Sequence, residues 1–412
     1  MSDAPSWRAR AERAVAATAS TGSKRPAALF GPDAPVDAPI HYVRARGCRV
    51  VAADGREYVD LVSALGAVAL GYADPEVTAA VTRAAADGNV AGLTSVLEPA
   101  LAERLCAVVP CAERAFFMKS GAEAIAAAVR LARAATGRDR VIGSGYFGWL
   151  DWWSTGPGIP AGASADFRAV PFGDVEALGA AVDEAGPSLA AIVVEPVVEQ
   201  AAPIAWLRAA RALAEGAGAV LVYDEVKTGC RVHTGGWQAV CGVVPDVAVF
   251  GKALANGWPL AAVVGRAGVM EAARRAWVSS TLASESAALA AAHAVLDRHA
   301  REDVCGGLAA RGRALREAVA GELAGAAVHG VGLVGPDPMW FLRFADGADE
   351  AGRLPAARRE TAFVTAARAE GVLFKRGAYD YAMLAHDDDA VAQVARAAGA
   401  GFAAVRALDG GA

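Results

Sequence analysis

AVLVYDEVKTG at residues 219–229 and PDVAVFGKALANGWPL at residues 245–260 decide the fold of this chain. Each stretch contains a short apolar run that changes abruptly to polar residues. Asp224 follows the first run, and Lys252 follows the second. Such runs are typical of buried parallel strands. Because ligands of open α/β sheets bind beyond the carboxyl ends of the strands, we expect Asp224 and Lys252 to face one ligand.

A carboxylate and a primary amine at one sheet edge suit the cofactor pyridoxal 5'-phosphate. Its aldehyde forms a Schiff base with a lysine, and a carboxylate keeps its ring nitrogen protonated, so that the ring withdraws electrons from the substrate. We therefore expect Lys252 to bind the cofactor covalently and Asp224 to contact its ring. Either residue alone is also typical of a solvated loop, so other motifs have to agree.

A strand-to-helix junction supplies a candidate phosphate site. Residues 115–118 predict a strand, and a long helical run follows Ser120, Gly121 and Ala122. Backbone N–H groups at a helix N-terminus bind anions, and a glycine lets the backbone approach the ligand closely. The same sequence is also typical of an ordinary capped helix start.

A glycine motif further along the chain suggests a different ligand. Residues 143–148 fit G-x-G-x-x-G after an apolar strand, which is the fingerprint of dinucleotide binding. That fingerprint needs a helix at the third glycine, whereas here Trp149, Trp152 and Trp153 and a loop follow. We therefore discount a dinucleotide. The tryptophans either pack in the core or wall an apolar substrate pocket.

Composition excludes several classes of protein. The 412 residues carry a net charge of −5, which argues against nucleic-acid binding, and no apolar run approaches the length of a membrane span. The six cysteines show neither a CxxC nor a metal-ligand spacing. We expect free thiols in a reducing cytoplasm and no metal site. The N-terminus lacks the apolar core of a secretory signal.

Taken in order, DEVKTG, PDVAVFGKALANGWPLAAVVG and the motifs before them resemble the class III aminotransferases of the fold-type I pyridoxal phosphate enzymes. The chain is most similar to the glutamate-1-semialdehyde aminomutase-like branch, from about Val43 to the C-terminal helix. The resemblance implies an α/β fold with a mainly parallel sheet in a large domain. The N- and C-terminal segments would form a smaller α/β domain. We expect an arm and strands in residues 1–65, the cofactor-binding domain in 66–300 and the rest of the small domain in 301–412.

The resemblance also assigns roles to single residues. Tyr146 would stack on the cofactor ring, with Phe147 where a histidine is usual, and Val226 would pack beneath the ring. Glu195 would lie near the ring oxygen and the substrate as a third catalytic residue. Thr281 would reach the phosphate of the neighbouring subunit's cofactor, which implies a homodimer with shared active sites.

Four residues are weaker candidates for substrate contacts: Trp149, Glu199, Arg376 and Asp380. Asp380 stands roughly where the aminomutase branch has an acidic residue. A solvated loop is the alternative for Arg376.

The expected reaction is transamination between a small-molecule amino donor and a keto or aldehyde acceptor, with Lys252 moving the proton. An aminomutase, a racemase or a decarboxylase would use the same residues, because pocket geometry decides which bond reacts. A binding protein that had lost turnover would have no reason to retain Lys252 and Asp224. The alternative that the protein is an oxidoreductase rests on the glycine motif alone.

Overall fold

The chain forms two compact units in the computed structural model, which describes residues 6–32, 34–35, 37–349 and 352–410. The smaller unit joins the two ends of the chain, residues 1–74 and 307–412, and the larger unit comprises residues 75–306. The sequence placed the boundaries after residues 65 and 300. The structure divides the chain after Asp74 and Gly306.

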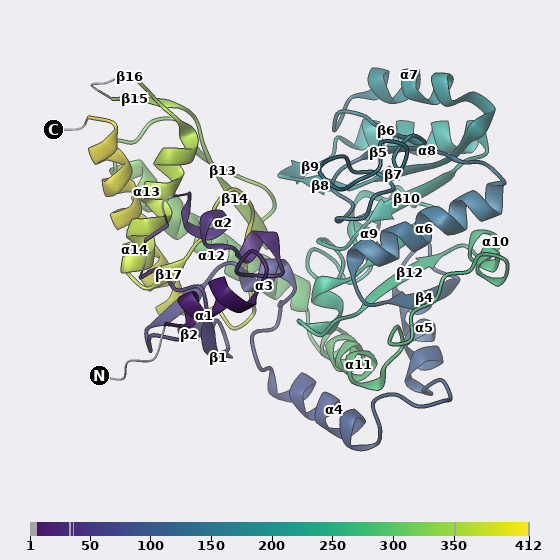
Figure 1. Ribbon diagram of the computed structural model, residues 1–412, viewed down its shortest axis with the longest axis horizontal. Coiled ribbons are helices and arrows are strands. Elements are labelled where there is room, and N and C mark those ends of the chain that lie inside the picture. The colour runs from purple at the N-terminus through teal and green to yellow at the C-terminus, as the bar shows by residue number, and fades with distance from the viewer. Residues whose placement is uncertain (1–5, 33, 36, 350–351, 411–412) are drawn as a thin grey trace. The chain divides into compact units, whose positions relative to one another are not determined.

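The larger unit is built on a seven-stranded sheet in the order β4-β12-β11-β10-β7-β5-β6 (Figure 1). Its strands are β4 (Arg114–Met118), β5 (Arg140–Ser144), β6 (Phe167–Ala169), β7 (Leu189–Val194), β10 (Val220–Asp224), β11 (Val247–Phe250) and β12 (Ala261–Gly265). β10 pairs in parallel with β7 and β11, whereas β12 is antiparallel to both β11 and β4. The predicted α/β fold with a mainly parallel sheet is confirmed. The carboxyl ends of all its strands except β12 therefore point to one edge of the sheet.

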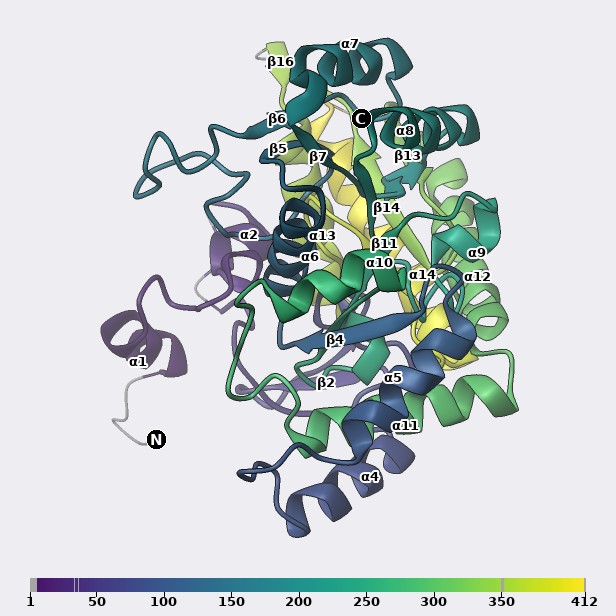
Figure 2. The same ribbon diagram turned by 90° about the vertical axis from the view of Figure 1, so that its right-hand side faces the viewer.

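Helices bury both faces of this sheet. Every residue of β7 and β10 is buried, which explains why both strands read as continuous apolar runs. Helix α6 (Gly121–Thr136) packs its apolar residues against one face. Helix α8 (Ile204–Ala217) contacts β7 and β10, and Figure 2 places it on the other side of the sheet from α6. Helix α7 (Val175–Ala185) contacts α8 and β5.

The remaining helices of the larger unit flank its sheet. Helix α11 (Ser286–Arg301) packs against α4 (Pro75–Ala86) and α5 (Leu97–Val108). Two short helices complete the unit. Helix α9 (Trp237–Cys241) lies in the connection between β10 and β11, and helix α10 (Ala267–Met270) follows β12.

Strand pairing explains why both chain ends form one unit. Strands β1 (Tyr42–Arg46), β2 (Arg49–Ala52) and β3 (Glu57–Asp60) form an antiparallel sheet, and the predicted Asp54-Gly55 hairpin joins β2 to β3. The C-terminal strand β17 (Val372–Leu373) pairs with β3. The unit is completed by α1 (Trp7–Ala14), α2 (Pro26–Phe30), α3 (Ser63–Gly66), α12 (Val304–Gly325), β13 (Val331–Val334), β14 (Met339–Phe344), β15 (Gly347–Asp349), β16 (Gly352–Leu354), α13 (Ala356–Ala369), β18 (Asp380–Tyr381) and α14 (Asp388–Leu408). Within the described ranges, no helix has the length and apolar content to cross a membrane.

Candidate active site

Three predicted catalytic residues come from the carboxyl ends of three neighbouring strands. Asp224 is the last residue of β10, Glu195 follows β7, and Lys252 lies two residues beyond β11. Asp224 and Glu195 are both buried, and Lys252 is partly buried. The order of strands in the sheet therefore places two acids and an amine side by side at one edge.

Burial and neighbouring charges set the ionisation of this group. Burial, followed by the negative charge of Glu195, raises the pKa of the Asp224 carboxyl to about 7. Burial, followed by the positive charge of Lys227, lowers the pKa of the Lys252 ammonium to about 8. Near neutral pH, Lys252 is thus much closer to its neutral, nucleophilic form than a surface lysine is.

Lys252 is held in an unusual backbone conformation. Its φ is +47°, in the left-handed region that residues with a side chain rarely adopt. No hydrogen bond or ion pair of its Nζ is found within the part of the chain that the structure describes. Strained residues of this kind gather at functional sites. The amine is available to form a covalent bond.

The predicted phosphate turn is the capped N-terminus of α6. The N–H and Oγ of Ser120 both donate to Oε2 of Glu123 at 2.9 Å, and the Glu123 N–H donates back to Oγ of Ser120 at 3.3 Å. The structure therefore shows a capped helix start, and the phosphate site stays a prediction. The cap leaves the next two N–H groups, of Gly121 and Ala122, without a partner among the described residues. These two amides fit a phosphate group.

Val226 lies between two turns of the site. A Cβ added at Gly121 would lie 3.1 Å from Cγ2 of Val226, and one added at Gly251 would lie 3.5 Å from its Cγ1. The Val226 N–H donates to Oδ1 of Asp224 at 3.0 Å, which leaves Oδ2 of Asp224 for a ligand. This arrangement suits a flat ring whose nitrogen faces Asp224 and whose phosphate lies at α6, so the residues present fit pyridoxal phosphate.

The glycine motif packs the turn after β5 against this site. Gly145 has a φ of +139°, and a Cβ there would lie 2.5 Å from the Cβ of Glu195. Gly148 has a φ of +87°, and a Cβ there would overlap Ala122. No helix follows Gly148. The glycines are explained by close packing of the turn rather than by a dinucleotide.

The aromatic residues of this turn divide into core and surface. Phe147 is buried against Trp152 and Trp153, so it takes a place in the core and supplies no polar contact. The ring of Tyr146 is exposed and meets Trp153 edge-on at 5.6 Å between centroids. Trp149 is 74% exposed and lines a cavity of about 630 Å³ along α6, and Lys252, Asp224 and Glu195 are not among the residues that line it.

Of the other predicted substrate residues, one belongs to the larger unit and two belong to the smaller one. Glu199 forms the turn between β8 (Val197–Val198) and β9 (Gln200–Ala201), with a φ of +56°. Asp380 and Arg376 belong to the smaller unit.

In the smaller unit both residues are held by their neighbours. Oδ1 of Asp380 accepts the N–H of Lys375 at 2.8 Å, and burial raises the pKa of the Asp380 carboxyl. Nε of Arg376 donates to Oγ1 of Thr361 at 3.0 Å. Their contact with a substrate stays a prediction.

Sequence reasoning missed Lys227 and assigned no role to Glu225, the neighbour of Asp224. Nζ of Lys227 pairs with Oε1 of Glu195 at 2.6 Å, and both side chains are nearly buried. Glu225, the second acid of the strand-end pair, accepts the N–H groups of Trp237 and Gln238 at 2.7 and 3.0 Å and so caps a short helix. The available signal for Lys227 was a lysine three residues after the strand-end acid Asp224. The described residues contain no cluster that could hold a metal ion.

A mainly parallel sheet that presents an acid, a lysine and a helix N-terminus at one edge is the arrangement of a fold-type I pyridoxal phosphate enzyme. The FumI protein of Sphingopyxis sp. MTA144, solved in its PLP internal aldimine form, matches this fold with a TM-score of 0.90. It is 28% identical in sequence, and the match covers 97% of this chain and 95% of that one.

The sequence narrows this class to one family. Residues 32–148 and 165–379 match the family model described as aminotransferase class-III, and the chain belongs to that family. It is 39% identical over 334 residues to 2'-deamino-2'-hydroxyneamine transaminase from Streptomyces kanamyceticus. This match covers 79% of this chain and 83% of that relative. It is also 39% identical over 253 residues to glutamate-1-semialdehyde 2,1-aminomutase from Symbiobacterium thermophilum, 57% of this chain and 58% of that relative. The predicted family, enzyme class and cofactor are confirmed.

Proposed function

We propose that Lys252 carries the cofactor and moves the proton in this aminotransferase, with Asp224 and Glu195 as its catalytic partners. The assignment of Lys252 rests mainly on one observation, the state of its amine. Its Nζ has no hydrogen-bond or ion-pair partner among the described residues, it lies in a strained turn at the carboxyl edge of the sheet that also carries Asp224, and its pKa is lowered to about 8. A lysine in this state is a good nucleophile near neutral pH.

Each surrounding residue has a task in binding the cofactor. The N–H groups of Gly121 and Ala122 would hold the phosphate, and Val226 would support the ring from one side. Oδ2 of Asp224 would hold a proton on the ring nitrogen. Tyr146 would cover the other side of the ring. When bound, the cofactor supplies a conjugated ring that stabilises negative charge on the substrate carbon.

Lys252 would act as base and then as acid. The amine of Lys252 would accept the proton from the amino-bearing carbon of the substrate. It would then return that proton to the C4' carbon of the cofactor. Asp224 would stay ionised throughout this transfer, which requires that Glu195 does not force a proton onto it.

An aminomutase is the second candidate function. The 39% identity to a glutamate-1-semialdehyde 2,1-aminomutase favours it, as does the acid Asp380, which stands roughly where that branch has an acidic residue. The two functions differ in whether the keto product leaves before the amino group is passed on. Trp149, Glu199, Arg376 and Asp380 remain the proposed substrate contacts, and the substrates remain a small-molecule amino donor and a carbonyl acceptor.

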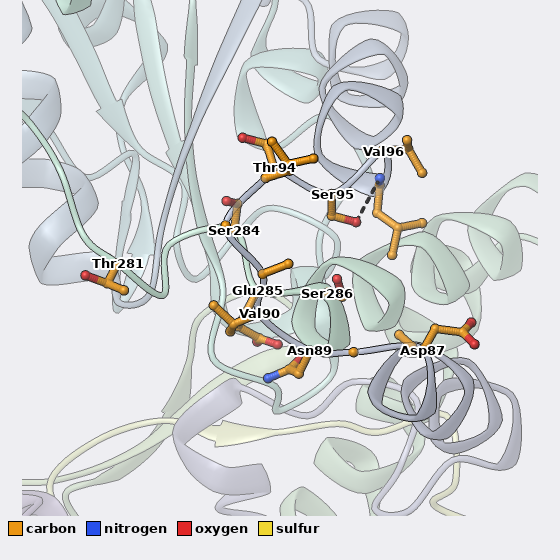
Figure 3. Close-up of a pocket in the computed structure, with 16 residues that line it drawn as sticks. Asp87, Asn89, Val90, Thr94, Ser95, Val96, Thr281, Ser284, Glu285 and Ser286 are labelled. Carbon is orange, nitrogen blue, oxygen red and sulfur yellow. Dashed lines mark hydrogen bonds between the residues drawn. The ribbon is translucent and has the colours of Figure 1, made fainter.

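We also propose that the enzyme is a cytoplasmic homodimer with shared active sites. Val90, Leu93 and Val96 are strongly exposed apolar residues of one loop, and together with Thr281 they line a cavity of about 560 Å³ (Figure 3). A monomer rarely exposes such a group of apolar side chains. In a dimer, Thr281 would reach the partner's cofactor phosphate. The six free cysteines support a reducing compartment.

A donor panel tests the proposed reaction. The holoenzyme is mixed with amines and amino acids one at a time, without an acceptor, and its absorption spectrum is followed. An aminotransferase converts the lysine-bound cofactor to its amino form and releases a stoichiometric carbonyl product. Release of no carbonyl product by any donor, together with isomerisation of an amino aldehyde, would replace transamination by the aminomutase reaction.

A further inference from the structure

Lys227 and Glu195 form a nearly buried ion pair inside the proposed site. Nζ of Lys227 lies 2.6 Å from Oε1 of Glu195, and the two side chains are only 12% and 8% exposed. The other carboxylate oxygen, Oε2, accepts the N–H of Tyr146 at 3.2 Å. Lys227 thereby links the turn after β10 to the end of β7 and, through Glu195, to the turn after β5.

Two acids and two amines gather around this pair. The acids are Asp224 and Glu195 and the amines are Lys252 and Lys227, and each of the four influences the ionisation of Asp224 or Lys252. The buried Arg231 adds a weaker positive charge that acts on Lys252. Glu225, the remaining acid of the strand end, is occupied by Thr228 and two backbone amides.

Without Lys227, Glu195 would be a buried carboxylate that has lost its partner, and its negative charge already acts on Lys252. A buried carboxylate that loses its partner is costly, so it recruits another cation or takes up a proton. Recruitment of Lys252 would keep that amine protonated and turned away from the cofactor aldehyde. Lys227 prevents this because it already occupies Glu195.

We propose that Lys227 is a positioning residue that holds Glu195 against the Tyr146 turn and so leaves the amine of Lys252 unpaired. The inference rests on the proposed role of Lys252 and adds to it a residue that the reaction chemistry alone does not require. In this role Lys227 needs no contact with the substrate or with the reacting atoms. It acts through the carboxylate of Glu195.

The test measures Lys252 in the apoprotein rather than turnover. Apoprotein is mixed with pyridoxal phosphate over a range of pH, and the rate of appearance of the lysine-bound absorption band gives the pH midpoint at which Lys252 becomes nucleophilic. Lys227→Met removes a repelling cation and frees Glu195, so the midpoint should rise by at least one pH unit. The rate at pH 7 should fall about tenfold.

Three further variants separate positioning from mere stability. Lys227→Arg keeps the charge and should keep the wild-type midpoint. Glu195→Gln leaves Lys227 uncompensated and should lower the midpoint. The double variant Lys227→Met/Glu195→Gln should return it towards the wild-type value, because both charges are gone.

A comparable ion pair far from the site serves as the matched control. Nη1 of Arg211 pairs with Oδ2 of Asp246 at 2.8 Å, at 20% and 9% side-chain exposure, where β11 begins. Arg211→Met should leave the midpoint unchanged even if it lowers the melting temperature. Unchanged midpoints in folded Lys227→Met protein, or in Glu195→Gln protein if Lys227→Met does not fold, would overturn the proposal. Absence of any lysine-bound band in the wild-type protein would instead overturn the role of Lys252.

Discussion

Asp224 illustrates the opposing demands on a residue of this site. Burial and Glu195 raise its pKa to about 7, whereas an exposed aspartate has an ordinary value of 3.8. The folded apoprotein therefore binds a proton at Asp224 more tightly than the unfolded chain does. The stability that this residue contributes is present below pH 3.8 and is lost as the pH rises through about 7.

Replacing this acid should therefore stabilise the apoprotein in a pH-dependent way. We expect apo Asp224→Asn to be more stable than the wild type, and the gain should grow by about 2 kcal/mol between pH 5 and pH 8. Denaturant unfolding of both apoproteins at the two pH values measures the gain. An equal gain at both values would show that the Asp224 charge is not the cause.

The sequence predicted which residues belong to the candidate site, but it did not predict which of their side chains meet. Asp224 and Lys252 follow apolar strands, so their place at the sheet edge could be read from the pattern. The ion pair of Lys227 with Glu195 joins residues of different strands, and one sequence does not show which side chains meet across a sheet. For the same reason, the role of Glu225 as a helix cap became visible only in the structure.

The turn after β5 shows how one element positions another. Its glycine motif lets the backbone pack against Glu195 and against the first turn of α6. A methyl group at Gly148 would overlap Ala122, and its φ of +87° is unfavourable for alanine. The packing of this turn and the proposed phosphate site are therefore coupled.

Gly148→Ala should weaken cofactor retention by at least tenfold, because the turn has to move away from Ala122. The dissociation constant of pyridoxal phosphate from the apoprotein, by fluorescence titration, measures this loss. Gly162→Ala is the control, since a Cβ there meets nothing within 4 Å and no positive φ is involved. Equal affinities of the two variants would contradict the coupling.

Most elements of the large sheet were predictable because buried parallel strands read as continuous apolar runs. The direction of β12 was not predictable. Its residues AAVVG are all buried, so the same apolar run fits a parallel or an antiparallel strand. The two-residue strands β8 and β9 were also beyond prediction, since such short pairs depend on a turn held by its surroundings.

At the scale of the whole molecule, the exposed loop at residues 88–96 is the feature that a single chain does not explain. Leu93 is 87% exposed and Val96 is 81% exposed. Burial of two large apolar side chains in a subunit interface would contribute several kcal/mol to association, at about 25 cal/mol per Å². The proposed dimer accounts for both residues.

Leu93→Glu should weaken the dimer at least a hundredfold, because a charge would be buried in the interface. Sedimentation velocity over a range of concentrations measures the dissociation constant. Val175→Glu, at an exposed apolar residue where α7 begins, is the control and should remain dimeric. A wild-type protein that sediments as a monomer, or a dimeric Leu93→Glu variant, would exclude this interface.

The most direct test of the account asks which lysine carries the cofactor. The chain has only five lysines, at positions 24, 119, 227, 252 and 375. Borohydride reduction of the holoenzyme converts the lysine-bound cofactor to a stable pyridoxyl amine, and peptide mass spectrometry then locates it. We predict the added mass on Lys252 alone, and its loss in Lys252→Ala protein that remains folded. A pyridoxyl group on Lys227 or on any other lysine would contradict the assignment of the active site.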